Sequence, residues 1–450
     1  MFNKYSFQYR FKENFNTTQI KAFLTLFAFS ICSNEVFGQP ILLQHVNVIT
    51  MSDSLIRYNQ DVFIQDGKIT KIAGKIKPKR KQKVKILSLK GKYIIPGLVD
   101  MHVHLKTENE LEDQLLYYLA AGVTGIRVMD SKSAQNELTK KVTDNHITAA
   151  PKLYLSYIIR RENSYSQESA DSLMSALKTS NYKFVKLFSL SNDSTFQHLM
   201  NSSKKYGVIV CGHYPIYRQF SKAIPIDFDK VLNSNFKSIE HLGGYTQLPD
   251  DKIALAAQQT KANNIFNCPT IDWDIMAYDL MYPNEYKQRF TYSMIPKNTL
   301  DQYEQDYLTN INKAGGNDAI IDQKNKYLPT YQKKINILKN LYQYKCPLLI
   351  GGDAGNLFQM DGFNLYEEMT LWSQAGIDNF TILQSASINP SLFFEELNKN
   401  GTIEEGKSAN LIVLEKNPLD NILNIKTIQY TFKDGMMFEN AILRSKLGIH

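Results

Sequence analysis

From Gly97 onward the chain repeats one pattern, a short apolar run followed by a polar segment of helical length, and this pattern constrains the fold most strongly. Short apolar runs bounded by turn residues are typical of buried strands, and their alternation with helices is typical of a parallel α/β sheet. Eight such runs predict a closed (β/α)8 TIM barrel. The predicted strands are Leu98–Val103, Thr124–Met129, Lys152–Tyr157, Phe184–Phe188, Val208–Cys211, Ser238–Glu240, Ile265–Cys268 and Pro347–Ile350.

A smaller β region precedes the barrel. Ile41–Thr50 and Val62–Lys71 alternate like strands around an Asp66-Gly67 turn, and Val84–Leu89 continues the alternation. With 450 residues, of which 43% are hydrophobic, the chain is long enough for two or three structural units. We therefore predict a small β unit in front of the barrel.

Basic residues are concentrated between Lys68 and Lys92, which holds eleven Lys or Arg residues of a chain with a formal net charge of +8. We interpret this stretch as a solvated face of strands and loops. Nucleic acid is disfavoured as a partner because Tyr93 is the only aromatic residue that accompanies the cations, whereas single strands are usually bound by stacking. Contact with an acidic surface or a membrane stays open.

The first 38 residues have the pattern of a secretory signal peptide. A positively charged opening precedes the apolar run Ala22–Cys32, and Val36-Phe37-Gly38 suits cleavage before Gln39. The run is too short for a stable membrane span, so we expect an exported protein, periplasmic or secreted. A lipoprotein anchored through Cys32 is the alternative, although Ile31 is a poor residue before a lipidated cysteine. The charged residues are Lys4, Arg10, Lys12 and Lys21.

Three cysteines would remain after cleavage, namely Cys211, Cys268 and Cys346. Their number is odd and no two are close in sequence, which does not fit a disulfide framework. We expect buried free thiols.

His102 and His104 stand near the end of the apolar segment Ile94–Leu105. A strand points alternate side chains to the same side, so both imidazoles face one way and form half of a metal site. A pair of surface histidines, or of hydrogen-bonded core histidines, is the simpler alternative. The Pro96-Gly97 turn and the apolar run weigh against it because they place the pair at the end of a buried strand.

Four more candidates fall on later predicted strands. His213, His241 and Asp353 each follow a strand directly, and the carboxyl ends of the strands carry the reactive groups in a TIM barrel. Lys186 lies inside the apolar run Phe-Val-Lys-Leu-Phe, where a free ammonium is costly to bury, so it must be paired, deprotonated or modified. Taken singly, the histidines could be core residues and Asp353 a turn former.

Taken together, these residues resemble the amidohydrolase superfamily, in particular its imidazolonepropionase-like hydrolases and related metallo-dipeptidases. The similarity runs from about Val46 to Asn421. The motifs that carry it are Pro-Gly-Leu-Val-Asp-Met-His-Val-His ending at His104, Gly-Val-Thr from Gly122, Ser-Ile-Glu-His ending at His241, Gly-Gly-Asp-Ala-Gly around Asp353 and Gly-Thr-Ile-Glu-Glu-Gly-Lys-Ser-Ala-Asn-Leu-Ile-Val-Leu from Gly401.

The resemblance implies a barrel inserted in a discontinuous domain. Residues 39–96 and 401–445 would pair into one β-sandwich, with the barrel at 97–400 and the signal peptide at 1–38. Ile403–Leu414 and Thr427–Phe438 supply the second half of the sandwich.

The resemblance also implies a binuclear site. His102 and His104 match the ligands of the more buried metal, with Asp353 as a further ligand. Lys186 matches a carbamylated lysine that bridges two divalent ions, and His213 and His241 match the ligands of the second ion. We expect two ions per chain, zinc in preference to other metals, and leave one ion as the alternative.

In the implied reaction, a bridging water loses a proton and attacks a carbonyl that a metal polarises. Asp353 is placed to take that proton and pass it to the leaving nitrogen. Tyr214 follows His213 where the family commonly has a small residue, and we interpret it either as a hydrogen-bond donor to a carbonyl oxygen or as ordinary packing. After strand two the family often has Arg-Asp, whereas here Arg127 precedes Val128 and Asp130 comes later.

The expected function is hydrolysis of a C–N bond in an amide, a cyclic amide or a small peptide. A small peptide is favoured because an exported enzyme would meet peptides, and imidazolonepropionase itself is disfavoured for the same reason. The alternatives are a non-catalytic, metal-containing barrel that binds a small ligand, and a hydrolase of another bond such as a lactone. A homo-oligomer stays open. Residues 270–345 are interpreted either as a partial lid over the metal site or as an outer helix pair.

Overall fold

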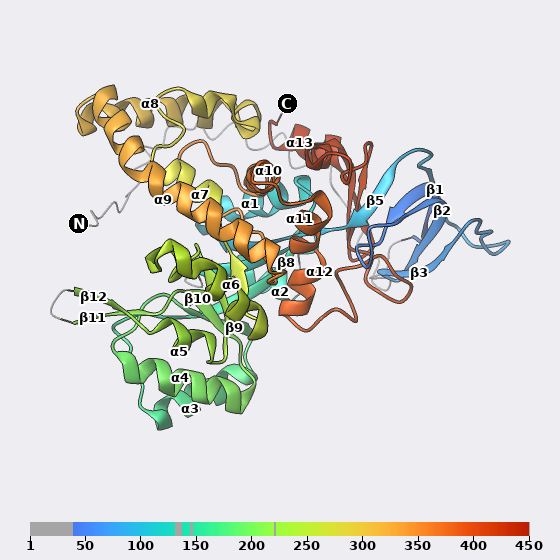
Figure 1. Cartoon of the computed structure of the whole chain (residues 1–450). Coiled ribbons are helices and arrows are strands. Elements are labelled where there is room, and N and C mark those ends of the chain that lie inside the picture. The colour runs from blue at the N-terminus through green and yellow to red at the C-terminus, as the bar shows by residue number, and fades with distance from the viewer. Residues whose placement is uncertain (1–38, 131–136, 145–146, 220–221, 450) are drawn as a thin grey trace. The chain divides into compact units, whose positions relative to one another are not determined.

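The structure is a computed structural model that describes residues 39–449 except 131–136, 145–146 and 220–221. The predicted signal peptide and Cys32 therefore lie outside the described residues. Among the helices that are described, none combines the length and the apolar character that crossing a bilayer requires. The described chain consists of a parallel barrel, a sheet built from both chain ends, and helices (Figure 1).

Seven parallel strands form the barrel wall, in the order β14-β13-β10-β9-β8-β7-β6. Each coincides with a predicted strand to within a few residues, because apolar runs of this length are buried on both faces. Their bounds are β6 Leu98–His104, β7 Val123–Asp130, β8 Lys152–Ile159, β9 Tyr182–Leu187, β10 Val210–His213, β13 Phe236–Glu240 and β14 Phe266–Cys268.

The eighth predicted strand, residues 347–350, closes the barrel as an extended segment and not as a regular strand. Leu349 donates its N–H to the Asn267 carbonyl at 2.8 Å, and Met101 donates to the Ile350 carbonyl at 2.9 Å. Ile350 instead donates to the carbonyl of Ser385, the last residue of helix α11 (Asn379–Ser385), at 3.2 Å, so part of the ladder is taken by the end of that helix. This competition explains why the segment lies where a strand was predicted but lacks a complete ladder.

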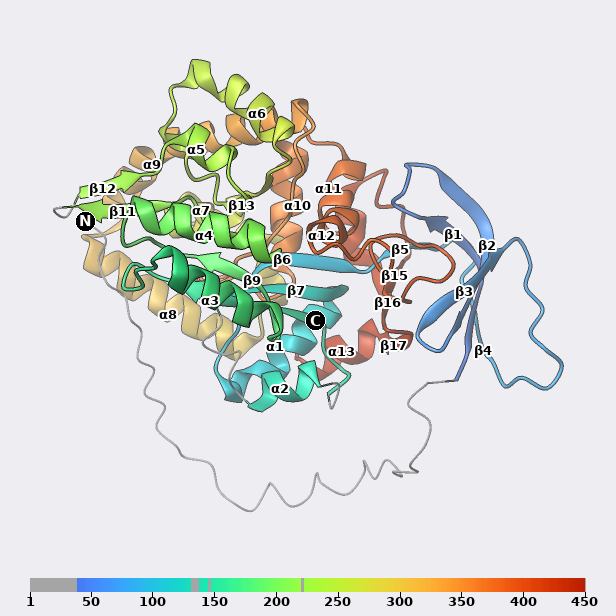
Figure 2. The same cartoon turned by 90° about the horizontal axis from the view of Figure 1, so that it is seen from below.

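The helices cover the barrel and extend one side of it (Figure 2). A hairpin of β11 Ile216–Gln219 and β12 Lys222–Pro225, which the sequence pattern did not indicate, follows β10. The helices are α1 Glu108–Ala120, α2 Glu137–Thr143, α3 Gln167–Lys178, α4 Asp193–Tyr206, α5 Phe228–Leu232, α6 Ile253–Ala262, α7 Ile271–Ala277, α8 Lys297–Ala314, α9 Asn317–Gln343, α10 Asn364–Gln374, α11 Asn379–Ser385, α12 Ile388–Phe393 and α13 Asn440–Lys446.

Both ends of the described chain meet in one sheet of eight strands. Its order is β17-β16-β15-β5-β1-β2-β3, and β4 pairs in parallel with the first half of β1. The predicted sandwich region is therefore hydrogen bonded as a single sheet, and its strands share one apolar core that includes Leu43, Val62, Leu411 and Phe432. The bounds are β1 Ile41–Ile49, β2 Ile56–Gln65, β3 Lys68–Ala73, β4 Lys85–Ser88, β5 Tyr93–Pro96, β15 Leu411–Leu414, β16 Ile428–Lys433 and β17 Met436–Glu439.

Candidate metal centre

All six predicted ligands lie on or directly after barrel strands. His102 and His104 belong to β6, Lys186 to β9 and His213 to β10. His241 follows β13 directly, and Asp353 follows the closing segment 347–350. Parallel strands end at one rim of a barrel, which is why residues far apart in sequence can meet there.

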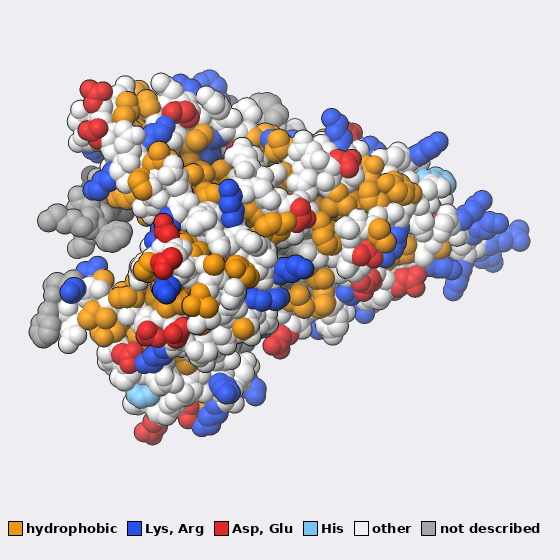
Figure 3. Space-filling model, in the orientation of Figure 1, with side chains coloured by type: hydrophobic (Ala, Val, Ile, Leu, Met, Phe, Trp, Pro, Cys, Tyr) orange, Lys and Arg blue, Asp and Glu red, His pale blue; other side chains and the backbone are white. Residues whose placement is uncertain are grey.

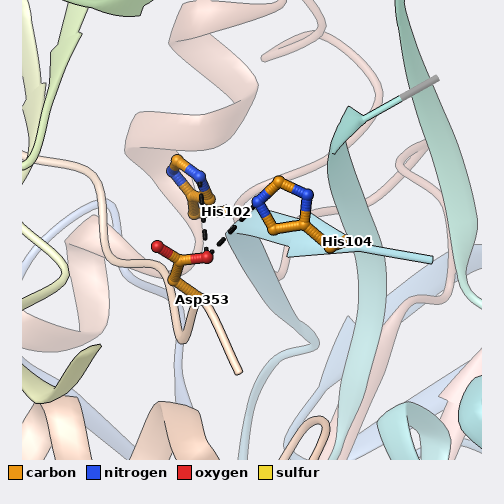
Figure 4. Close-up of side chains that lie close together, drawn as sticks. All are labelled: His102, His104 and Asp353. Carbon is orange, nitrogen blue, oxygen red and sulfur yellow. Dashed lines mark ion pairs between the residues drawn. The ribbon is translucent and has the colours of Figure 1, made fainter. Parts of the chain in front are cut away.

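Asp353 faces both histidines of β6 (Figure 4). Its Oδ1 lies 3.4 Å from His104 Nε2 and 3.8 Å from His102 Nε2. One ligand atom from each residue lies within 4.8 Å of the other two, which fits three donors around one ion. His102 Nε2 is buried and has no hydrogen-bond partner, a costly state unless that nitrogen has a ligand.

His213 and His241 complete the cluster. The ring centroids of His213 and His241 are 5.0 Å apart, and those of His241 and His102 are 4.8 Å apart. His241 Nδ1 lies 3.8 Å from the second oxygen of Asp353. Asp353 therefore stands between the two halves of the predicted binuclear site.

The hydrogen bonds of three rings leave Nε2 as the atom available to a metal. His213 Nδ1 lies 3.3 Å from the Phe188 carbonyl, which can only accept, so Nδ1 carries the proton. His241 Nδ1 lies 2.6 Å from Thr270 Oγ1, whose own proton goes to the Pro269 carbonyl, so Nδ1 donates there as well. His102 Nδ1 donates to the carboxylate of Glu240 at 2.9 Å. In a neutral imidazole the other nitrogen then offers its lone pair.

Burial keeps these imidazoles neutral. It lowers the pKa of His213 to about 3 and the pKa values of His102 and His241 well below the ordinary histidine range. Burial alone would raise the pKa of Asp353, but His102 and His104 outweigh it and hold that pKa below its usual range. Neutral imidazoles around an ionised carboxylate are the state that a divalent cation requires.

Lys186 is buried, with 1% of its surface exposed. Among the described residues, no side chain or carbonyl forms a hydrogen bond or ion pair with its ammonium. Burial lowers the pKa of Lys186. The predicted modification would convert this unpaired amine into an anionic oxygen donor, which would let Lys186 join the other candidate ligands around a divalent cation.

The backbone takes unusual conformations at two of the ligands. His241 has φ 58° and Asp353 has φ 43°, both in the left-handed region that β-strands avoid. Consecutive strand residues point to opposite faces, so a regular strand would turn His241 away from Glu240. The left-handed turn brings both side chains toward the barrel axis, and such conformations concentrate at functional sites.

Gly351 allows the extended segment before Asp353 to approach β6 closely. A Cβ built on this glycine would lie 2.6 Å from the Cβ of His102 and 2.7 Å from its backbone nitrogen. Any larger residue would therefore displace His102. The glycine of the Gly-Gly-Asp motif is needed for this approach and not only for a turn.

A polar network inside the barrel fixes the position of the His102 ring through its Nδ1 atom. Glu240 Oε2 accepts from His102 Nδ1 and, at 2.7 Å, from the Arg127 guanidinium, while Ser238 donates to Glu240 Oε1 at 2.7 Å. Arg127 also donates to the Met101 carbonyl at 2.5 Å and to Ser238 at 2.9 Å. Sequence reasoning gave Glu240 and Ser238 no role beside His102, although polar residues at alternate positions of an apolar strand were a usable signal.

Tyr214 is buried and donates its hydroxyl to the Ile226 carbonyl at 2.6 Å. Its ring occupies the space beside Gly243 and Gly244. Because the hydroxyl proton of Tyr214 is donated to Ile226, it is not available to a substrate carbonyl. The geometry therefore favours the packing interpretation of Tyr214.

Part of the region 270–345 reaches the site. The ring of Trp273 in α7 lies 6.0 Å from that of His241, and the neighbouring Asp274 pairs with Lys334 of α9 at 2.6 Å. Farther along, tyrosines stack on one another and on Phe358, as between Tyr286 and Phe358 with centroids 4.2 Å apart. The region therefore combines a wall beside the candidate metal centre with a helical extension that packs into the same hydrophobic core as the barrel.

The three cysteines behave as predicted. Cys211, Cys268 and Cys346 are free and buried, and burial raises the pKa of Cys211 and Cys346 to about 12. Thiols in this state are not nucleophiles at neutral pH.

Comparison with known proteins identifies a family for most of the chain. The model of the family described as Amidohydrolase family matches residues 93–437. Among curated relatives, a dihydroorotase of Carboxydothermus hydrogenoformans is 33% identical over 94 residues, which cover 20% of this chain and 21% of that protein. A dihydroorotase of Bacillus cytotoxicus is 34% identical over 104 residues, which cover 20% of this chain and 24% of that protein. The chain thus spans about a quarter or less of these relatives.

Solved structures share the fold over most of both chains. A Xaa-Pro dipeptidase with bound methionine superposes with a TM-score of 0.64 at 16% identity and covers 89% of this chain and 100% of its own. A bottromycin amidohydrolase superposes with a TM-score of 0.65 at 17% identity, and the match covers 90% of each chain. A molinate hydrolase superposes with a TM-score of 0.65 at 14% identity, and the match covers 90% of this chain and 95% of that protein. At these identities the likeness concerns the fold.

Proposed function

The chain belongs to the amidohydrolase family, and from this we propose that it is a metal-dependent hydrolase of a C–N bond in a small amide, cyclic amide or peptide. The observation that carries the proposal is the cluster of four imidazoles and one carboxylate at the carboxyl ends of the strands, with an unpaired lysine on β9. An ordinary core would not leave the buried His102 Nε2 without a hydrogen-bond partner, nor bury Lys186 without an ion pair.

His102, His104 and Asp353 would hold one divalent ion, and His213 and His241 the second, with carbamylated Lys186 between them. When bound, such ions supply an activated water and polarise the carbonyl of a substrate. The chain itself orients the donors: Glu240, Phe188 and Thr270 fix the imidazole protons on Nδ1, so that Nε2 is presented in each case.

Asp353 is the proton carrier in this proposal. Its pKa is held below the usual range, so at neutral pH it is ionised and can accept a proton from the attacking water. The same oxygen can then donate the proton to the leaving nitrogen. With its hydroxyl committed to Ile226, Tyr214 is left out of this relay.

The substrate class follows from the walls of the site and the named neighbours. Trp273 offers an aromatic surface beside His241, and a Xaa-Pro dipeptidase and a bottromycin amidohydrolase share the fold. These favour a small peptide substrate, whereas the short dihydroorotase match favours a cyclic amide. We place the peptide first because the structural likeness extends over most of the chain.

A turnover screen tests the proposal. Protein loaded with zinc, and the same protein after chelation, would be incubated with free and N-blocked dipeptides, with cyclic amides and with lactones. Metal-dependent release of an amine from a peptide or cyclic amide is the expected result. Hydrolysis of lactones alone would assign another bond type, and tight ligand binding without turnover in the loaded protein would support the non-catalytic alternative.

A further inference from the structure

The loop between β3 and β4, together with the first residue of β4, holds nearly all of the formal net charge of the chain. Residues 75–85 contain seven Lys or Arg residues and no Asp or Glu, so the rest of the chain, at +8 less +7, carries only +1. No acidic residue occurs between Gly67 and Val99. Such asymmetry identifies a surface for an anionic partner, because it is a local feature and not a general excess of charge.

The structure exposes every one of these cations. None of the seven forms an ion pair with a carboxylate of the described residues. Figure 3 shows the Lys and Arg side chains gathered at one extremity of the face that it draws, with no acidic side chain among them. The seven residues are Lys75, Lys77, Lys79, Arg80, Lys81, Lys83 and Lys85.

The base of the loop is fixed to the sheet. Ile76 is buried, and its N–H donates to Asp61 Oδ2 at 2.8 Å. Gln82 donates its N–H to the Lys79 carbonyl at 2.9 Å and its amide to Gln65 at 3.2 Å. The cations are therefore presented on a loop with defined anchors, projecting beyond β3 and β4 (Figures 1 and 2).

We propose that this basic loop binds the surface of a bilayer that contains anionic phospholipid headgroups. A projecting loop can touch a flat surface with several cations at once, and no groove is required. The loop has no aromatic residue to stack on a base, which disfavours single-stranded nucleic acid. Ile86, next to Lys85, is 54% exposed and offers one apolar side chain at the same place.

The expected preference of the protein for anionic over neutral bilayers is large and sensitive to salt. Each Lys or Arg near an anionic leaflet strengthens binding by roughly fivefold, so three in contact give about a hundredfold preference over a neutral bilayer. The interaction falls off within a Debye length, about 10 Å at 0.1 M salt and about 3 Å at 1 M. The loop belongs to the terminal sheet and contributes nothing to the metal cluster, so binding should not require turnover.

Vesicle sedimentation with the full protein tests this. Vesicles of phosphatidylcholine alone are compared with vesicles in which about a third of the lipid is phosphatidylglycerol. We expect about a hundredfold preference for the anionic vesicles at low salt, and its loss at high salt. A loop variant should lose most of that preference and keep its peptide or cyclic-amide turnover. The loop variant carries Lys77→Gln, Lys79→Gln, Arg80→Gln and Lys81→Gln.

A charge-matched variant separates the loop from the net charge. It carries Lys178→Gln, Lys204→Gln, Lys313→Gln and Lys339→Gln, four exposed lysines on helices of the barrel side. This variant should bind anionic vesicles like the wild type. Equal losses in both variants, equal binding to neutral vesicles, or tighter binding to duplex DNA than to the vesicles would each overturn the proposal.

Discussion

Replacing Glu240 by Gln tests whether the polar network inside the barrel holds a metal ligand or only stabilises the fold. Glu240 Oε2 accepts from both His102 and Arg127, and Oε1 accepts from Ser238. In the variant the amide oxygen can replace Oε2, and the amide nitrogen can donate to the Ser238 hydroxyl. The substitution therefore removes the charge and leaves every hydrogen bond geometrically available.

The magnitude follows from the two charged bonds that become weaker. Hydrogen bonds to charged groups contribute about 1.5–3 kcal/mol against about 1 kcal/mol for neutral ones, so two weakened bonds cost roughly 1–4 kcal/mol of unfolding free energy. Partners of metal-binding histidines typically change metal affinity by about 10-fold to 100-fold, and the retained hydrogen bonds put Glu240→Gln near the lower value. Glu240→Leu leaves the buried Arg127 with neither a carboxylate nor any other acceptor in its place and should cost about 3–5 kcal/mol.

The assay measures zinc retained after dialysis against graded chelator, together with the melting temperature. The matched control is Glu396→Gln. It alters a half-buried carboxylate that accepts hydrogen bonds from Lys152 and Tyr154 at the amino-terminal end of β8, whereas the candidate ligands lie at the carboxyl ends of the strands. The control should lower stability without releasing zinc. If Glu240→Gln retains zinc as tightly as the control does, the network is structural and does not hold His102 for the metal.

Four other outcomes are expected. Lys186→Ala should lose roughly one of two bound ions and most of the turnover, as measured by metal analysis, and an unchanged metal content would exclude a bridging role. Asp353→Asn should lower turnover by at least about a hundredfold, with some metal still bound and substrate affinity within about tenfold, whereas near-normal turnover would leave Asp353 a turn residue. Tyr214→Phe should keep turnover within about tenfold, because the Tyr214 hydroxyl is bonded to a main-chain carbonyl; a larger loss would restore it as a catalytic donor. In metal-free protein the unfolded chain protonates His213 near pH 6.5, whereas the folded state, with a pKa of about 3, does not. Denaturant titrations should therefore show stability falling as pH drops from about 7 toward about 3, with a smaller fall in His213→Gln.

The barrel could be predicted because its signal is local. An apolar run such as the one ending at His104 specifies a strand from its own composition, and the parallel α/β rule then places the residues at strand ends on one rim. Five of the six candidate ligands were found this way, and Lys186 was found by the cost of burying a lysine inside an apolar strand. The structure places His102, His104 and Asp353 together, with His213 and His241 nearby.

Other features depend on contacts between distant segments. The sequence marks Pro347–Ile350 as a strand, but the last residue of α11 takes one of its hydrogen bonds, and nothing in the segment itself encodes that competition. Likewise the single sheet joins β5 to β15, strands that lie more than three hundred residues apart. Tertiary packing decides such pairings because the energy comes from the shared core.

The orientations of the side chains in the site were decided by the tertiary structure alone. Strand periodicity would turn Glu240 and His241 to opposite faces, and only the left-handed backbone at His241 brings both inward. Arg127 and Glu240 pair across the barrel interior at 2.7 Å, and each buried charge offsets the cost of burying the other. The sequence by itself determined which residues are candidate ligands. The tertiary structure decided which nitrogen His102, His213 and His241 present, since that depends on hydrogen bonds to other segments of the chain.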